Sequence, residues 1–208
     1  MCNIIYYSFV LLLSVSVSGF PAVIKNTNET FPFCSRECWG AKPPTDTRFL
    51  NTPVPYVIIH HTAIPTACYT TDQCIQDMQS MQNFHNSINW GDIGYNFCVG
   101  SDGLAYEGRG WKVVGIHAGN ANSQSVGICL IGDWRDDLPP EKQLSTTKSL
   151  IAQGVQLGVI SSEYKLIGHN QAMATECPGA ALFTYLSTWK HFHPGHVEFK
   201  PNPKNKKV

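Results

Sequence analysis

His60, His169 and Cys177 are the side chains in this sequence best suited to bind a metal ion. Imidazole nitrogen and thiolate sulfur both suit Zn²⁺, and a catalytic zinc site uses three protein ligands and leaves a position for water. His60 ends one apolar run, His169 follows another, and Cys177 comes eight residues after His169, so the intervening loop is long enough to fold back. The chemistry that such a site supports is hydrolysis by a metal-activated water.

Spacing alone leaves a second interpretation open. A histidine followed eight residues later by a cysteine is not a recognised metal signature, and the chain contains 8 histidines. In this alternative, His60 is a buried strand residue and Cys177 pairs with another cysteine. His60 and His61 are neighbours, and successive side chains of a strand point to opposite faces, so both do not easily bind one metal. The alternation does not say which of the two would bind.

The elements that must position these residues follow from the apolar pattern. Residues 55–61 form a β-branched run that predicts a buried strand, and residues 71–88 place apolar side chains at spacings of three and four, on one helix face. We also predict strands at 93–99, 126–131 and 164–167, a hairpin turn at 101–103 leading into 104–106, and a helix opening at Pro139 with Leu144, Ile151 and Val155 on one face. Strands alternating with helices predict an α/β fold, a single domain with a mixed central β-sheet flanked by helices.

The length of 208 residues suits one domain, which we expect at residues 34–193. Before it we expect a mobile leader at 20–33, and after it a disordered tail at 194–208 that is poor in apolar residues. Lysine plus arginine equals aspartate plus glutamate at 15 each, so no strong net charge favours binding to nucleic acid or to an anionic membrane. Recognition then depends on a shaped site.

Residues 1–19 contain no charged side chain, carry an apolar run, and end in small residues. This pattern predicts a signal peptide and a secreted protein, with no membrane span once the signal is removed. Removing Cys2 with the signal leaves seven cysteines, an odd number in an oxidising compartment. If Cys177 is a metal thiolate, six remain for pairing.

Several longer motifs resemble the peptidoglycan recognition protein family, which is similar to the phage-type zinc amidases. The resemblance extends from Ser35 to Phe192, essentially the whole expected domain. It rests on residues 57–63 (VIIHHTA), 92–97 (DIGYNF), 106–111 (YEGRGW), 168–169 (GH) and 175–179 (TECPG). It implies the type 2 amidase fold, a Zn²⁺ cofactor, and hydrolysis of the amide between N-acetylmuramic acid and L-alanine of the bacterial peptidoglycan stem peptide.

The same resemblance implies a role for individual residues. It assigns zinc to His60, His169 and Cys177, with Tyr95 and Thr175 as catalytic residues beside the activated water. Relatives that only bind peptidoglycan commonly have serine in place of Cys177, and a neutral hydroxyl is a much poorer zinc ligand than a thiolate. The cysteine therefore predicts an enzyme, with a non-catalytic peptidoglycan receptor as the alternative.

The resemblance also implies a glycopeptide groove and one disulfide. The groove residues are His61, His85, Asn89, Trp90, Tyr95, His117 and Asn122, and the disulfide joins Cys68 to Cys74. No pairing is assigned to Cys34, Cys38, Cys98 or Cys129, and the last two lie in apolar strands as candidate buried thiols. Asn89-Trp90 and Ser123 give a divided signal between diaminopimelate-type and lysine-type stem peptides, and residues 133–135 and 138–140, which look like the insect long-chain amidases, favour the diaminopimelate type. The resemblance also favours an immune-damping role, with direct antibacterial clearance as the alternative.

Overall fold

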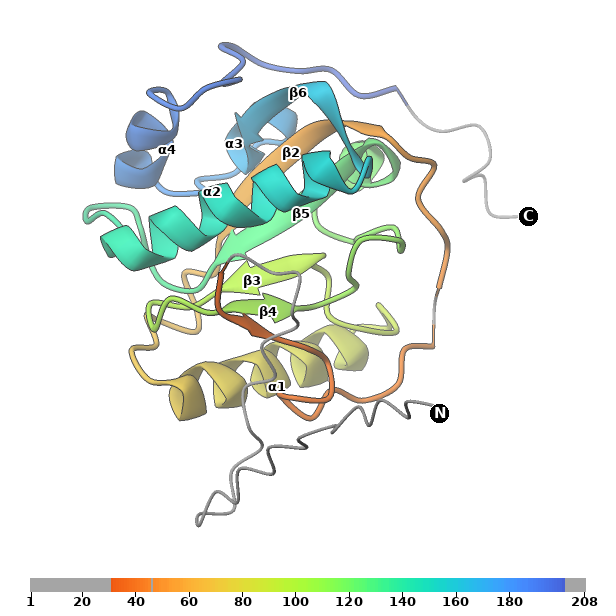
Figure 1. Ribbon diagram of the computed structural model, residues 1–208, viewed down its shortest axis with the longest axis vertical. Helices are drawn as coiled ribbons and strands as arrows, with labels where there is room; N and C mark the ends of the chain where they lie inside the picture. Colours follow the sequence, from red (N-terminus) through yellow and green to blue (C-terminus); the bar gives the residue numbers. More distant parts are fainter. Residues whose placement is uncertain (1–30, 46, 201–208) are drawn as a thin grey trace, which may run out of the picture.

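One six-stranded sheet organises the chain in the computed structural model, which describes residues 31–45 and 47–200 (Figure 1). The elements are β1 (Phe33–Cys34), β2 (Val54–His61), α1 (Thr71–Ser87), β3 (Phe97–Val99), β4 (Ala105–Glu107), η1 (Gly119–Gln124), β5 (Ser125–Leu130), α2 (Glu141–Gln156), β6 (Ile160–Gly168), α3 (His169–Ala172) and α4 (Ala180–Leu186). The predicted signal peptide at 1–19 and most of the predicted leader lie outside the described residues. None of the described helices is long and apolar enough to cross a membrane.

The order and direction of the strands place the two predicted histidine ligands at the same end of two neighbouring strands. The order is β1-β4-β3-β5-β2-β6, and β2 pairs in parallel with both β5 and β6. Because β2 and β6 run in the same direction, their carboxyl ends meet, and these ends carry His60 and His169. Only the β3–β4 pair is antiparallel among the described strand pairs, as the predicted hairpin requires.

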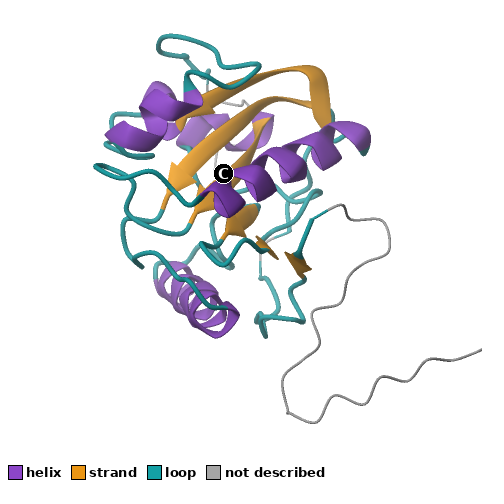
Figure 2. Ribbon diagram, turned by 60° about the vertical axis from the view of Figure 1, so that its left-hand side comes forward, coloured by secondary structure: helices purple, strands orange, loops and turns teal. Residues whose placement is uncertain are grey.

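Helices cover both faces of this sheet, as α/β proteins with parallel strands require. Alternating residues of β2, Val57 and Ile59, pack into a core shared with α2 and α4, and α2 lies across the strands in Figures 1 and 2. The opposite face packs against α1 through a second cluster that includes Met78 and Met81. The predicted α/β class with one mixed sheet is therefore confirmed.

The structure differs from the predicted elements at one strand near the site. We expected a strand over residues 93–99, but β3 spans only Phe97–Val99. The Asn96 side chain donates to the carbonyls of Gly110 and Val113 and accepts from the Gly127 amide, so it replaces ladder bonds at this point. Residues 93–96 consequently form a fixed loop, and this loop carries Tyr95.

Both ends of the predicted domain extend further than we expected. The leader was predicted to reach residue 33, yet Phe31 is buried and Phe33 pairs with Ala105 in β1. A disordered tail was predicted from residue 194, yet the Val197 amide donates to the Gln171 carbonyl and Phe199 packs edge-on against Tyr56 at 4.9 Å. Val197 and Phe199 pack against the domain, and the Gln171 and Asn120 side chains donate to carbonyls of this segment. Residues 201–208 lie outside the described part of the chain.

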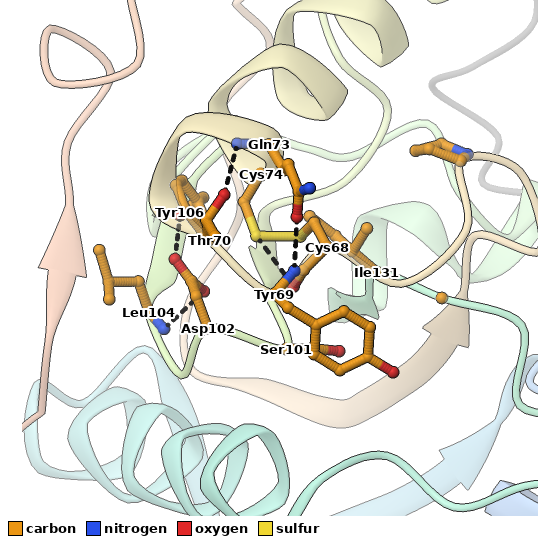
Figure 3. The surroundings of a disulfide bond; sticks show 12 residues. Cys68, Tyr69, Thr70, Gln73, Cys74, Ser101, Asp102, Leu104, Tyr106 and Ile131 are labelled. Carbon is orange, nitrogen blue, oxygen red and sulfur yellow. Dashed lines mark hydrogen bonds between the residues drawn. A yellow bond between two sulfur atoms is a disulfide. The ribbon is translucent and has the colours of Figure 1, made fainter.

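A disulfide between Cys68 and Cys74 ties the segment after β2 to the start of α1 (Figure 3). The helix begins beside it, where the Thr70 hydroxyl accepts from the Gln73 amide as an N-cap. A second disulfide, between Cys34 and Cys38, was not assigned from the sequence. Cys98 and Cys129 are buried free thiols, as suggested by their apolar strands.

We expect the Cys68→Ala/Cys74→Ala double variant to lose about 2–3 kcal/mol of unfolding free energy, because the short closed loop no longer restricts the unfolded chain. For a domain of this size the melting temperature should fall by roughly 5–10 °C. Circular dichroism melts of the two proteins measure the difference. An unchanged melting temperature would show that the disulfide does not stabilise the domain.

Candidate metal centre and groove

Three side chains from separate elements converge where β2 and β6 end. His60 is near the end of β2, His169 is the first residue of α3, and Cys177 lies in the loop before α4. One ligand atom from each lies within 4.8 Å of the other two. His60 is buried and the other two are half-buried, so a metal held here would be reached from one side only. The structure therefore brings together the three residues proposed from the sequence.

The surroundings of Cys177 restrict the state of its sulfur. The His61 amide donates to Sγ over 3.3 Å, and the Asn170 amide donates to the Cys177 carbonyl over 2.8 Å, which holds the loop against α3. Burial raises the pKa of the Cys177 thiol to about 12, while the amide of His61 acts in the opposite direction. A thiolate at this position thus needs a nearby positive charge, which a divalent metal would supply.

The two imidazoles are neutral near pH 7. Burial lowers the pKa of His60 well below its ordinary value, helped by His117 and His169. Burial also lowers the pKa of His169 to about 4. Neutral imidazoles keep the lone pairs that a metal requires, and His169 Nε2 is buried without a hydrogen-bond partner. Two nitrogens and one sulfur form a donor set that fits zinc.

Tyr95 lies beside these ligands on the loop before β3. Its ring centroid is 5.3 Å from that of His60 and 5.9 Å from that of His85. Burial, with smaller effects from neighbouring thiols, raises the pKa of Tyr95 well above its ordinary value, so the hydroxyl keeps its proton and can donate a hydrogen bond. Thr175 is exposed two residues before Cys177, and its Oγ1 accepts from the Cys177 amide over 3.2 Å.

Three of the residues assigned to the groove are turned into the protein. His61 points away from His60, as strand alternation predicts, and its Nδ1 accepts from the Trp134 amide over 3.1 Å. His117 Nδ1 lies 3.0 Å from His60 Nε2, and Asn122 Oδ1 accepts from the amides of His117 and Ala118. In the structure, these three side chains therefore bond to protein groups around the site.

Of the remaining groove residues, His85 and Tyr95 line an open cavity beside the C-terminal half of α1, and Asn89 and Trp90 follow that helix. The His85 ring stacks on Trp90 at 4.5 Å, and its Nδ1 accepts from the Gly94 amide. Burial, then the Arg109 charge, lowers the pKa of His85 to about 4. Asn89 is exposed at a φ of 62°, where the chain leaves the helix. The cavity, of about 540 Å³, is lined by Thr62, Ile64, Pro65, Ser80, Met81, Phe84, His85 and Tyr95.

Known proteins are similar to this chain in sequence and in fold. The family model described as N-acetylmuramoyl-L-alanine amidase matches residues 50–180. Peptidoglycan-recognition protein LB of Drosophila melanogaster is 46% identical over 87% of this chain and 81% of its own length. The chain is an amidase-type member of the peptidoglycan recognition protein family. The family and fold predicted from the sequence are thereby confirmed.

Two further relatives of this family widen the comparison. N-acetylmuramoyl-L-alanine amidase of Mus musculus is 43% identical over 74% of this chain, which spans only 30% of the mouse protein. A solved structure of Drosophila PGRP-LB, a tyrosine-to-phenylalanine mutant in complex with tracheal cytotoxin, superimposes with a TM-score of 0.77 at 49% identity. It covers 78% of this chain and 96% of that one.

Sequence reasoning missed several residues that shape the site of this family member. Arg109 donates to the carbonyls of Trp90 and Ile93 and its amide donates to the Tyr95 carbonyl, so it supports the loop that carries Tyr95. Arg109 belongs to one of the motifs quoted above, but a motif gives no direction for a side chain. Ile64 and Phe84 form an apolar rim of the cavity, at 87% and 61% exposure. Their exposure could not be read from hydrophobicity, which predicts burial.

Proposed function

We propose that this chain is a secreted, zinc-dependent N-acetylmuramoyl-L-alanine amidase that binds bacterial peptidoglycan and muropeptide fragments. It hydrolyses the amide between the lactyl group of N-acetylmuramic acid and L-alanine of the stem peptide. His60, His169 and Cys177 hold the zinc. The observation that carries the proposal is the convergence of these three donors, with a cysteine that can supply a thiolate.

Each residue has a distinct part in the reaction. When bound, zinc would lower the pKa of its water to about 7 and would polarise the scissile carbonyl. Tyr95, whose pKa is raised by burial, donates a hydrogen bond to the oxyanion that develops on that carbonyl. Thr175 contributes a neutral hydrogen bond at the exposed side. This bond is weaker than one donated by a charged ammonium group, which the phage-type enzymes have at this position.

The groove is proposed to take the glycopeptide beside this centre. Ile64, Phe84, His85 and Tyr95 line the cavity, and Trp90 stacks on His85. By resemblance we assign Asn89, His61, His117 and Asn122 to the same groove, the last three from the surrounding wall. The similarity to a PGRP-LB structure in complex with tracheal cytotoxin supports a muropeptide as ligand. Diaminopimelate-type fragments are the favoured substrates because the segment at 133–140 looks like the insect long-chain amidases.

The compartment and biological role follow from the same resemblance. The predicted signal peptide and two disulfides among the described cysteines favour secretion into an oxidising environment. We propose that degradation of the elicitor damps an innate immune signal, with direct antibacterial clearance as the alternative role.

Zinc content measured together with stem-peptide release tests the activity. Purified protein should contain about one zinc per chain and release stem peptide from purified peptidoglycan. A chelator should remove both, and added zinc should restore both. Metal-free protein that binds peptidoglycan without releasing peptide would overturn the enzyme and leave a non-catalytic receptor.

A further inference from the structure

The contact between His60 and His117 connects the metal centre to the wall of the groove. His60 has two ring nitrogens with different neighbours. Its Nδ1 lies 3.8 Å from Cys177 Sγ, whereas its Nε2 lies 3.0 Å from His117 Nδ1. The nitrogen that faces the other ligands is therefore Nδ1, and Nε2 faces away from them.

A hydrogen bond between two neutral imidazoles requires one donor and one acceptor, so the pair has two possible states. In the first, His60 Nε2 carries the proton and donates to His117 Nδ1, which leaves the lone pair of His60 Nδ1 free. In the second, His117 Nδ1 donates, and His60 carries its proton on Nδ1, directed at the metal position. Only the first state allows His60 to bind zinc.

The fold holds His117 where its Nδ1 can accept a hydrogen bond from His60 Nε2. A Cβ added at Gly115 would lie 2.4 Å from the His117 ring, and one added at Gly127 would lie 2.6 Å from it, so two glycines make room for the imidazole. The Asn122 side chain fixes the backbone by accepting from the amides of His117 and Ala118. His117 is only 8% exposed, which keeps water from the contact with His60, and its Nε2 has no protein partner, so the Nδ1 contact with His60 is what acts on its tautomer.

We propose that His117 is a positioning residue that selects the metal-binding tautomer of His60. The inference rests on the proposed zinc site and deepens it. Histidine ligands commonly donate their second ring nitrogen to a fixed acceptor, which orients the ring and raises its basicity as a ligand. Here the acceptor is another imidazole, and its own position depends on Gly115, Gly127 and Asn122.

The direct test is the tautomer of each ring in the metal-free wild-type protein. Long-range ¹H–¹⁵N correlation spectra distinguish a protonated ring nitrogen from an unprotonated one. We expect His60 and His117 both to carry their proton on Nε2. A proton on His60 Nδ1 would overturn the proposal, and this measurement requires no variant.

Two variants then test the consequence for the metal. His117→Phe keeps a ring in the glycine cradle and removes the acceptor, so the Kd for zinc should rise about 10–100-fold. His117→Gln offers an amide oxygen as acceptor and should recover most of that loss. The control is His196→Phe, an exposed histidine outside the site, which should leave the zinc Kd unchanged. Competition with a chromogenic chelator measures all three constants.

The outcomes separate this inference from the proposed function. If wild-type protein binds no zinc, the proposed function fails. If wild-type protein binds zinc and His117→Phe binds it equally tightly, only the positioning role fails, and His117 is a groove residue. Should His117→Phe not fold, the wild-type spectra still decide, because a proton on His60 Nδ1 overturns the proposal without any variant.

Discussion

Replacing Cys177 with serine is expected to remove zinc and to abolish release of stem peptide, while binding of glycopeptide persists. The sulfur is one of three donors whose ligand atoms lie within 4.8 Å of one another. A serine hydroxyl is a neutral oxygen donor and a poor zinc ligand, so the site would keep only two imidazoles. The groove residues His85, Trp90 and Asn89 come from α1 and the turn that follows it, and they do not depend on this sulfur.

The measurement has three parts: zinc content by atomic absorption, peptide release by chromatography, and muropeptide affinity by calorimetry. We expect zinc below one-tenth of the wild-type content and peptide release at background. The muropeptide Kd should stay within about threefold of wild type, a change in binding free energy of less than ~0.7 kcal/mol. Cys98→Ser makes the same chemical change at a buried free thiol that is not one of the three ligands, and it should retain zinc. A Cys177→Ser protein that still cleaves peptidoglycan would exclude the proposed ligand set.

The central strands and the two long helices were predictable from the sequence because their apolar residues are periodic, whereas β1, α3 and α4 were not predicted. The β-branched run at 55–61 became β2 and the spacings at 71–88 became α1, since each pattern matches one geometry and no other. The apolar pattern does not give the direction of a strand. Direction nevertheless decides where the ligands meet, because only parallel pairing of β2 and β6 brings His60 to His169. The resemblance to the amidase family supplied the assignment of the three ligands, which periodicity could not.

Side-chain direction was the least predictable property. Strand alternation separates His60 from His61 but does not say which one faces the metal. The resemblance assigns His117 and Asn122 to the groove, but it does not give their contacts with His60 and with the backbone. Gly115 and Gly127 leave the space for the His117 ring, which only the folded chain reveals. The tail at 194–200 was expected to be disordered on composition, yet Val197 and Phe199 pack against the domain and Gln171 and Asn120 hydrogen-bond to its backbone.

Replacing Tyr95 with phenylalanine is expected to lower kcat about 10²–10³-fold while zinc stays bound, because one donor to the oxyanion is lost. The Tyr95 ring lies 5.3 Å from that of His60, and phenylalanine fills nearly the same space. The zinc Kd and the melting temperature should therefore change little. KM should also change little, because the hydrogen bond strengthens only as charge develops on the carbonyl.

Steady-state kinetics on a soluble muropeptide, with zinc content measured on the same sample, separates this role from a structural one. Tyr69→Phe is the matched control, since it removes a hydroxyl from a 61% exposed tyrosine, and it should keep full turnover. A Tyr95→Phe protein with full zinc and full turnover would remove Tyr95 from the mechanism. Because burial raises the pKa of Tyr95, a loss caused by a missing donor should also be uniform from pH 6 to 9, whereas loss of a tyrosinate base would grow as the pH rises.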